Sequence, residues 1–134
     1  MPSLSRWSIG AALLYLTLGF TLGGLLLANK GLAIWPVLWL TLPAHMDFLL
    51  VGWMAQLAFG VAFWILPRFG KGRPRGKEGI AWVAIVCLNL GIWLVVGGSI
   101  LSGHGFVLAG RVVEMAASLA FILSTWKRVK PFGI

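Results

Sequence analysis

Charged residues are scarce in this chain, and acidic residues are the scarcest of all. Among 134 residues, lysine and arginine together number 11, whereas aspartate and glutamate number only 3. Hydrophobic residues make up 60 % of the chain, and its mean hydropathy is +0.96. In soluble domains about a quarter of the residues are charged. The composition therefore excludes an ordinary soluble domain and predicts an integral membrane protein.

Cysteine and histidine are also rare. The single cysteine, Cys87, excludes an intrachain disulfide and CxxC metal chemistry. The two histidines, His45 and His104, are too few for a three-histidine copper or zinc site in one copy. Walker loops and nucleophile elbows are absent from the sequence. We expect no copper in a monomer and no enzyme activity from a single chain.

Long apolar segments fill most of the sequence. Windows of about 20 residues, the length that crosses about 30 Å of hydrocarbon, identify four spans at about 8–28, 45–66, 79–101 and 105–126. The first span follows Arg6, but it is too long for a signal peptide and lacks a small-residue cleavage site. We predict an all-α integral membrane protein, with residues 1–134 forming a single domain of four transmembrane helices in two hairpins.

The basic residues gather after the second and fourth spans: Arg68, Lys71, Arg73, Arg75, Lys77, Lys127, Arg128 and Lys130. Such an excess is typical of cytoplasmic segments. It predicts a multi-pass protein of the plasma (inner) membrane with both chain termini in the cytoplasm. The connections at about 29–44 and 102–105 then lie outside. We expect the basic loop to contact anionic lipid and not nucleic acid.

Tryptophan and proline dominate the connection between the first two spans, LAIWPVLWLTLP at 32–43. Trp35 and Trp39 have helical spacing, and tryptophan favours the membrane interface. This segment is either a short interfacial helix or a Pro-kinked extension of the second span. In the first span, Gly19 and Gly23 have the GxxxG spacing that lets helix backbones approach closely, which we assign to packing within the bundle.

The second span has a conspicuous polar and glycine-containing face. At about 100° per residue, His45, Gly52 and Gln56 share this face. A histidine followed two turns later by glycine suits a planar ligand standing edge-on against the helix. The alternative is that His45 caps the helix or bonds a carbonyl near the headgroups.

His104 lies in the SGHG turn before the fourth span, on the same predicted side as His45. Two histidines on different helices of a four-helix unit can supply both axial ligands of a haem iron. The alternative is that His104, flanked by two glycines, is a solvated turn residue.

Arg111 and Glu114 are the charges inside the fourth span, and we expect them to pair with each other or with a bound group. Arg111 shares the face of His104, so it is a candidate partner for a haem propionate. Asp47 is on another face than His45 and is expected to face water. Four further polar residues are expected to form interhelical hydrogen bonds: Tyr15, Thr17, Thr21 and Asn89.

The run from His45 through Gly52, Gln56 and Gly60 to Leu66-Pro67-Arg68 resembles the second helix of the catalytic subunit of haem–copper oxidases and nitric oxide reductases, and of small membrane proteins related to it. In that superfamily the histidine at the outer end of this helix is an axial ligand of the low-spin haem, and the helix ends in a similar Leu-Pro motif. The resemblance implies that His45 is a haem ligand, with Gly52 and Gln56 beside the cofactor.

The chain departs from the superfamily in lacking most of its helices, its copper-ligating and high-spin haem histidines, and the tyrosine near them. The resemblance therefore implies haem b binding without oxygen or nitric oxide reduction in a single chain. Because the superfamily core consists of three similar four-helix units, the resemblance also implies a homo-oligomer, with a trimer favoured over a dimer. We expect electron transfer with a respiratory partner, or sensing of a diatomic gas. The alternative is a non-catalytic accessory or assembly subunit without bound metal.

Overall fold

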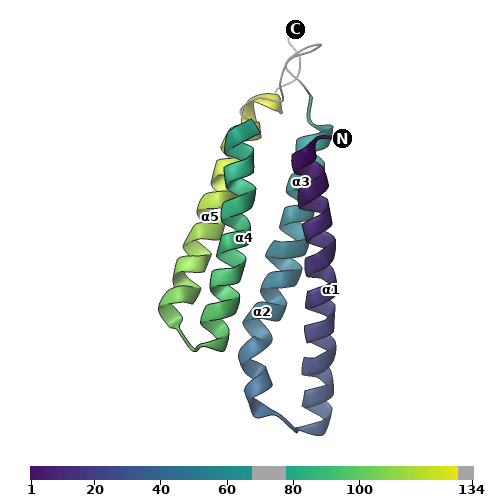
Figure 1. Cartoon of the computed structure of the whole chain (residues 1–134), viewed down its shortest axis with the longest axis vertical. Coiled ribbons are helices and arrows are strands. Elements are labelled where there is room, and N and C mark those ends of the chain that lie inside the picture. Colours follow the sequence, from purple (N-terminus) through teal and green to yellow (C-terminus); the bar gives the residue numbers. More distant parts are fainter. Residues whose placement is uncertain (68–77, 130–134) are drawn as a thin grey trace.

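A computed structural model describes residues 1–67 and 78–129, and every secondary-structure element within them is helical (Figure 1). Helix α1 spans Ser3–Leu32, α4 spans Glu78–Ile100 and α5 spans His104–Thr125, which continues into the short η3, Trp126–Arg128. The second span is one continuous rod of four pieces: η1 (Pro36–Thr41), α2 (Leu42–Asp47), η2 (Phe48–Ala55) and α3 (Gln56–Ile65). The four predicted spans are thus confirmed as helices.

The first two spans are longer than predicted. Each contains 30 residues, against 23 and 25 for the other two. At 1.5 Å per residue a 30-residue helix is about 45 Å long, more than the roughly 30 Å of hydrocarbon. These two helices are therefore longer than the hydrocarbon is thick, and the lower end of the α1–α2 hairpin extends beyond the α4–α5 hairpin (Figure 1).

The tryptophan-rich connection is an extension of the second span, so the second of the two predicted alternatives is confirmed. The 3₁₀-helix η1 begins at Pro36 and runs directly into α2. Asn29 closes the preceding turn, because its side chain donates to the carbonyl of Trp35 (2.9 Å) and accepts from the same residue's backbone N–H (2.8 Å). Ala33 in this turn adopts a left-handed conformation, with φ of 52°.

A π-helical stretch, η2, interrupts the second span between Asp47 and Gln56. Its hydrogen bonds join residues five apart instead of four, so its turns are wider than those of an α-helix. Such stretches are rare in proteins, and those that occur often lie at functional sites.

The helices pack as two hairpins, α1 with the second span and α4 with α5 (Figure 1). The α4–α5 contact is close because Gly91 and Gly110 face each other: a Cβ on Gly110 would lie 2.8 Å from the carbonyl oxygen of Gly91. Two apolar cores join the hairpins, one with Phe63, Ile85 and Phe121 and one with Tyr15, Phe48 and Ile92. We call the end with residue 1 and η3 the terminal end and the end with residues 33–35 and 101–103 the loop end.

The terminal end is fastened by Arg128. Its side chain is 2 % exposed and donates to the carbonyl oxygens of Phe63 (3.0 Å), Leu66 (2.5 Å) and Pro67 (3.0 Å). These carbonyls belong to the last turn of α3 and the residues after it, where positive charge is favourable. Arg128 therefore holds the Leu-Pro end of the second span. The basic residues predicted for the cytoplasmic loop, and Lys130, lie outside the described residues.

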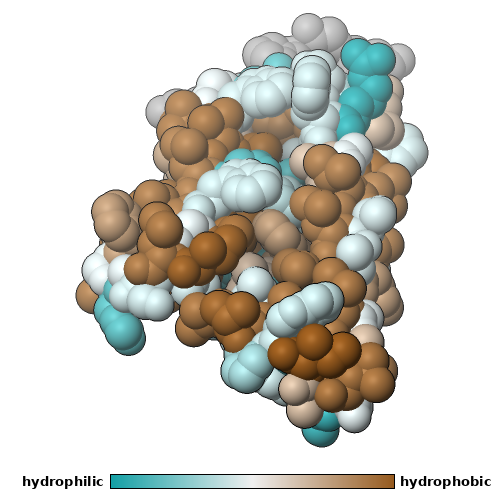
Figure 2. Space-filling model, turned by 60° about the horizontal axis from the view of Figure 1, so that its bottom comes forward, coloured by the Kyte–Doolittle hydropathy of each residue, from teal (hydrophilic) through white to brown (hydrophobic). Residues whose placement is uncertain are grey.

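Most of the surface is apolar, as Figure 2 shows for the face turned toward the viewer. Exposed leucine, isoleucine, valine, methionine, phenylalanine and tryptophan side chains occur on all four spans. In a soluble protein such a surface would aggregate, whereas in a bilayer it faces lipid tails. The predicted contact with the lipid bilayer is consistent with this surface.

Candidate functional site

His45 lies in α2 with its ring against α1. Its Nδ1 is 2.8 Å from the carbonyl oxygen of Gly19, and a Cβ on Gly23 would lie 2.6 Å from its Cε1. Gly19 in turn faces Leu49 of η2. The GxxxG glycines therefore serve packing within the chain, as predicted. Because a carbonyl oxygen can only accept, Nδ1 carries a proton, and in the neutral imidazole Nε2 is the nitrogen with the free lone pair.

This hydrogen bond agrees with both interpretations of His45. It is the carbonyl bond that a purely structural histidine would form. It is also the bond that metal-ligating histidines usually make with their second nitrogen, which orients the ring and fixes its tautomer.

Gly52 faces a planar group, and that group is the side chain of Tyr15. A Cβ on Gly52 would lie 2.6 Å from the Cγ of Tyr15. The same ring stacks on Phe48, with centroids 5.5 Å apart. The strip that the helix pattern offered to a planar ligand is therefore occupied by a residue of α1.

Gln56 is fully buried one turn further along. Neither its Oε1 nor its Nε2 has a hydrogen-bond partner within the described residues. Gln56 borders a cavity of about 300 Å³ between α1, α3 and α4 whose walls include Trp7, Trp82 and Trp93. The structure thus places Gly52 and Gln56 on the predicted face, turned toward α1 and α4.

Two of the four predicted interhelical hydrogen-bonding residues do bond across helices. The Tyr15 hydroxyl donates to Oδ1 of Asn89 (2.8 Å), which joins α1 to α4. The prediction for Thr17 and Thr21 was wrong, because both hydroxyls donate to carbonyls of their own helix, those of Leu13 and Thr17. Both threonines are exposed on α1, where bonding their own backbone satisfies the hydroxyl without a neighbour.

Arg111 of α5 bonds two carboxylates and joins the two hairpins through one of them, Asp47 of α2. Its Nη1 donates to Glu114 Oε2 at 3.0 Å, as predicted for this pair, and also to Oδ1 of Asp47 in α2. The prediction that Asp47 faces water was wrong, because Asp47 is only 1 % exposed. Since Asp47 lies on another face than His45, it turns toward α5 while His45 turns toward α1. A propionate would compete with both carboxylates for this guanidinium.

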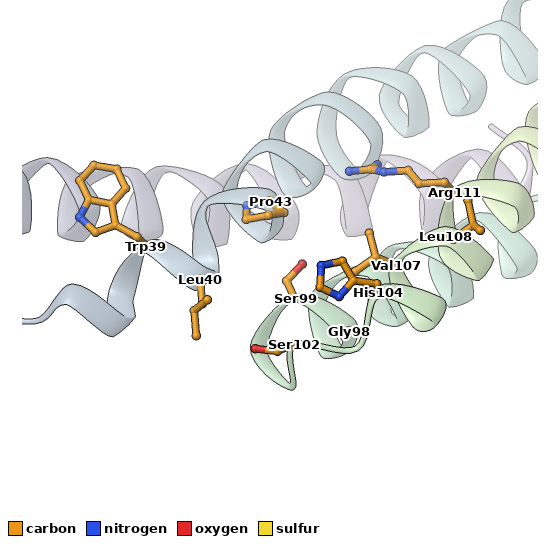
Figure 3. A pocket seen from close by; sticks show the side chains of 10 residues that line it. All are labelled: Trp39, Leu40, Pro43, Gly98, Ser99, Ser102, His104, Val107, Leu108 and Arg111. Atoms are coloured by element: carbon orange, nitrogen blue, oxygen red, sulfur yellow. The ribbon is translucent and has the colours of Figure 1, made fainter.

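His104 is exposed at the start of α5 and lines a cavity of about 460 Å³ at the loop end. Figure 3 shows the lining side chains, with Arg111 reaching from α5 toward the second span. The walls are mainly apolar and come from η1, α2, α4 and α5: Trp39, Leu40, Pro43, Gly98, Ser99, Ser102, Val107 and Leu108. His45 is not among the lining residues, so the two histidines face different surfaces of one chain.

Two features of the site differ from expectation: the burial of Asp47 and the contact of Tyr15 with Gly52. Asp47 is one of only three acidic residues, and a carboxylate within a span needs a counter-charge, so the pairing with Arg111 had a signal. The contact of Tyr15 with Gly52 had none. Among residues 1–67 and 78–129, no group of three or more His, Cys, Asp or Glu side chains converges as a metal site would require.

No family model, curated protein or solved structure matches this chain. The resemblance to haem–copper oxidases therefore rests on the second span alone and stays a prediction.

Proposed function

We propose that this chain is a membrane haem b-binding protein that transfers electrons, with His45 as an axial ligand. The observation that supports this proposal is the hydrogen bond from Nδ1 of His45 to the carbonyl of Gly19. In the neutral imidazole this bond places the proton on Nδ1 and leaves the lone pair on Nε2, the form in which histidine binds iron. Haem b, when bound, supplies a one-electron couple.

The residues around His45 suit a ligand histidine. Gly19 and Gly23 let α1 approach so closely that the ring is held in one place. Tyr15, Phe48 and Ile92 form an apolar core next to α2, which excludes water from this level of the bundle. Apolar surroundings of this kind tune the potential of a bound metal.

The second axial position favours an oligomer. His45 and His104 of one chain do not share a cavity, so a bis-histidine site would need two copies. Met46 and Leu50, which flank His45 along the second span, are about half exposed and offer an apolar contact surface. We infer a homo-oligomer, with the trimer implied by the resemblance as the first candidate. If His104 is not a ligand, the open iron position would instead favour binding of a diatomic gas.

The test is the visible spectrum of detergent-purified protein, expressed with ample haem, before and after reduction with dithionite. We expect a sharp low-spin spectrum that is lost in His45→Ala. Loss in His104→Ala as well would identify a bis-histidine haem and electron transfer. Retention in His104→Ala would identify another sixth ligand or an open position. Colourless wild-type protein would contradict the proposal.

A second candidate function is a metal-free accessory subunit of a respiratory membrane complex. Its support is that several polar groups inside the bundle are satisfied by one another, as in the Arg111 ion pairs and the Tyr15–Asn89 bond. Colourless protein that copurifies with a larger complex, with His45→Ala as well as without it, would favour this function.

A further inference from the structure

Three charged side chains meet where the two hairpins touch, and their charges do not cancel. Arg111 donates to Asp47 and to Glu114, so one guanidinium serves two carboxylates. If all three groups are ionised, one negative charge remains in excess. All three belong to helices that are long and apolar enough to span a membrane.

The excess charge is buried. Asp47 is 1 % and Glu114 is 6 % exposed, whereas the Arg111 side chain is 43 % exposed. Oδ2 of Asp47 and Oε1 of Glu114 have no hydrogen-bond partner within the described residues. A buried charge without a partner is strongly unfavourable, and carboxylates within a membrane usually mark proton or ion sites. One added proton would neutralise the group and supply one of the missing donors.

The neighbouring helices bring no second positive charge to this contact. From α1, Tyr15 bonds Asn89, and from α2, His45 bonds Gly19. The titratable side chains of α4 are Glu78 and Cys87, in its first half. On α5, His104 lies seven residues before Arg111, about 10 Å away along the helix.

Glu114 is held in position between α4 and α5. A Cβ on Gly91 would lie 2.7 Å from Cγ of Glu114 and 3.0 Å from the carbonyl oxygen of Gly110. The side chain of Glu114 is therefore packed closely between the two helices. Arg111, which binds it, lines the cavity of about 460 Å³ at the loop end, which offers a route to water.

We propose that Glu114 is a proton-binding site inside the membrane. Its carboxyl holds one proton while Asp47 and Arg111 form their ion pair, and this proton exchanges through the cavity that Arg111 lines. The site uses neither histidine, so its protonation can be measured in protein that binds no haem.

The test is modification by dicyclohexylcarbodiimide, an apolar reagent that attacks protonated carboxyl groups in membranes. The purified protein in lipid vesicles is treated over a range of pH, and mass spectrometry of peptides locates the adduct. The chain helps here, because Asp47, Glu78 and Glu114 are its only acidic side chains. We expect an adduct on Glu114 near neutral pH that disappears as the pH rises.

Two variants probe the charge balance. In Asp47→Asn, Glu114 becomes the sole partner of Arg111 and should ionise, so its labelling near neutral pH should be lost. In Glu78→Gln, a matched control at the start of α4, labelling of Glu114 should be unchanged. Far-UV circular dichroism and gel filtration check that each variant is folded.

Several results would overturn the proposal. They are the absence of an adduct on Glu114 in folded wild-type protein, labelling of Asp47 in its place, or unchanged labelling of Glu114 in folded Asp47→Asn. Protection of Glu114 by sodium but not by potassium, at equal ionic strength, would also overturn it, because the site would then bind a metal cation.

Discussion

The imidazole of His45 occupies the space that any side chain on Gly23 would need. A Cβ on Gly23 would lie 2.6 Å from Cε1 of His45, closer than two non-bonded carbon atoms can approach. Gly24, the next residue along α1, has no atom within 4 Å of the corresponding position. The two adjacent glycines therefore separate a packing requirement from the intrinsic effect of glycine in a helix.

Gly23→Ala should destabilise the protein, because α1 and the second span would have to move apart or His45 would have to leave its bond to Gly19. Overpacking of this kind costs about 1–3 kcal/mol. Gly24→Ala should be neutral or stabilising by about 0.5–1 kcal/mol, since alanine favours a helix over glycine. Thermal unfolding in detergent, followed by circular dichroism, measures both. Equal melting temperatures of the Gly23→Ala and Gly24→Ala variants would show that His45 does not pack on Gly23.

Tyr15→Phe should remove the hydroxyl bond to Asn89 while keeping the ring against Gly52 and Phe48. Interhelical hydrogen bonds in membranes contribute about 0.6 kcal/mol on average and up to about 1.7 kcal/mol. A double-mutant cycle with Asn89→Leu should therefore give a coupling energy in this range. Thr17→Val is the control, because Thr17 bonds only its own helix. A coupling near zero would contradict the α1–α4 bond.

Arg128→Gln should loosen the terminal end of the second span. Hydrogen bonds that involve a charged group contribute about 1.5–3 kcal/mol each, and Arg128 donates to three carbonyls. Amide hydrogen exchange across residues 60–66 should accelerate, and the melting temperature should fall. Lys127→Gln removes the exposed neighbouring charge and should change neither. If the amides of residues 60–66 exchange at the same rate in Arg128→Gln and Lys127→Gln, Arg128 does not stabilise the end of α3.

The four spans could be predicted from the sequence because crossing a bilayer depends on length and hydropathy alone. The ends of the first two spans could not, since hydropathy reports the hydrocarbon and not the turn beyond it. The second span begins at Pro36 because Asn29 closes the turn through two bonds to Trp35. The hydropathy of Asn29 does not predict these two hydrogen bonds.

The candidate site was predictable where it depended on one helix. His45, Gly52 and Gln56 share a face, and Arg111 pairs with Glu114 at the spacing of one turn. The contacts that decide what fills the space come from other helices. Tyr15 covers Gly52 and Asp47 reaches Arg111, across separations that no periodicity encodes. For this reason the sequence suggested a planar ligand where the structure has a tyrosine ring.

The π-helical stretch η2 lies between His45 and Gln56. The directions in which these two side chains point therefore depend on how η2 is wound. If the same residues formed an α-helix, each would turn by about 100°, more than a residue in the wider π-helical turns, and His45 would be rotated relative to Gln56. His45 would then leave Gly23, and Asp47 would leave Arg111. In evolutionary terms, the stretch has the form of a one-residue insertion that the wider turns absorb, and an α-helical relative would show a gap between Asp47 and Gln56 and a histidine directed the same way.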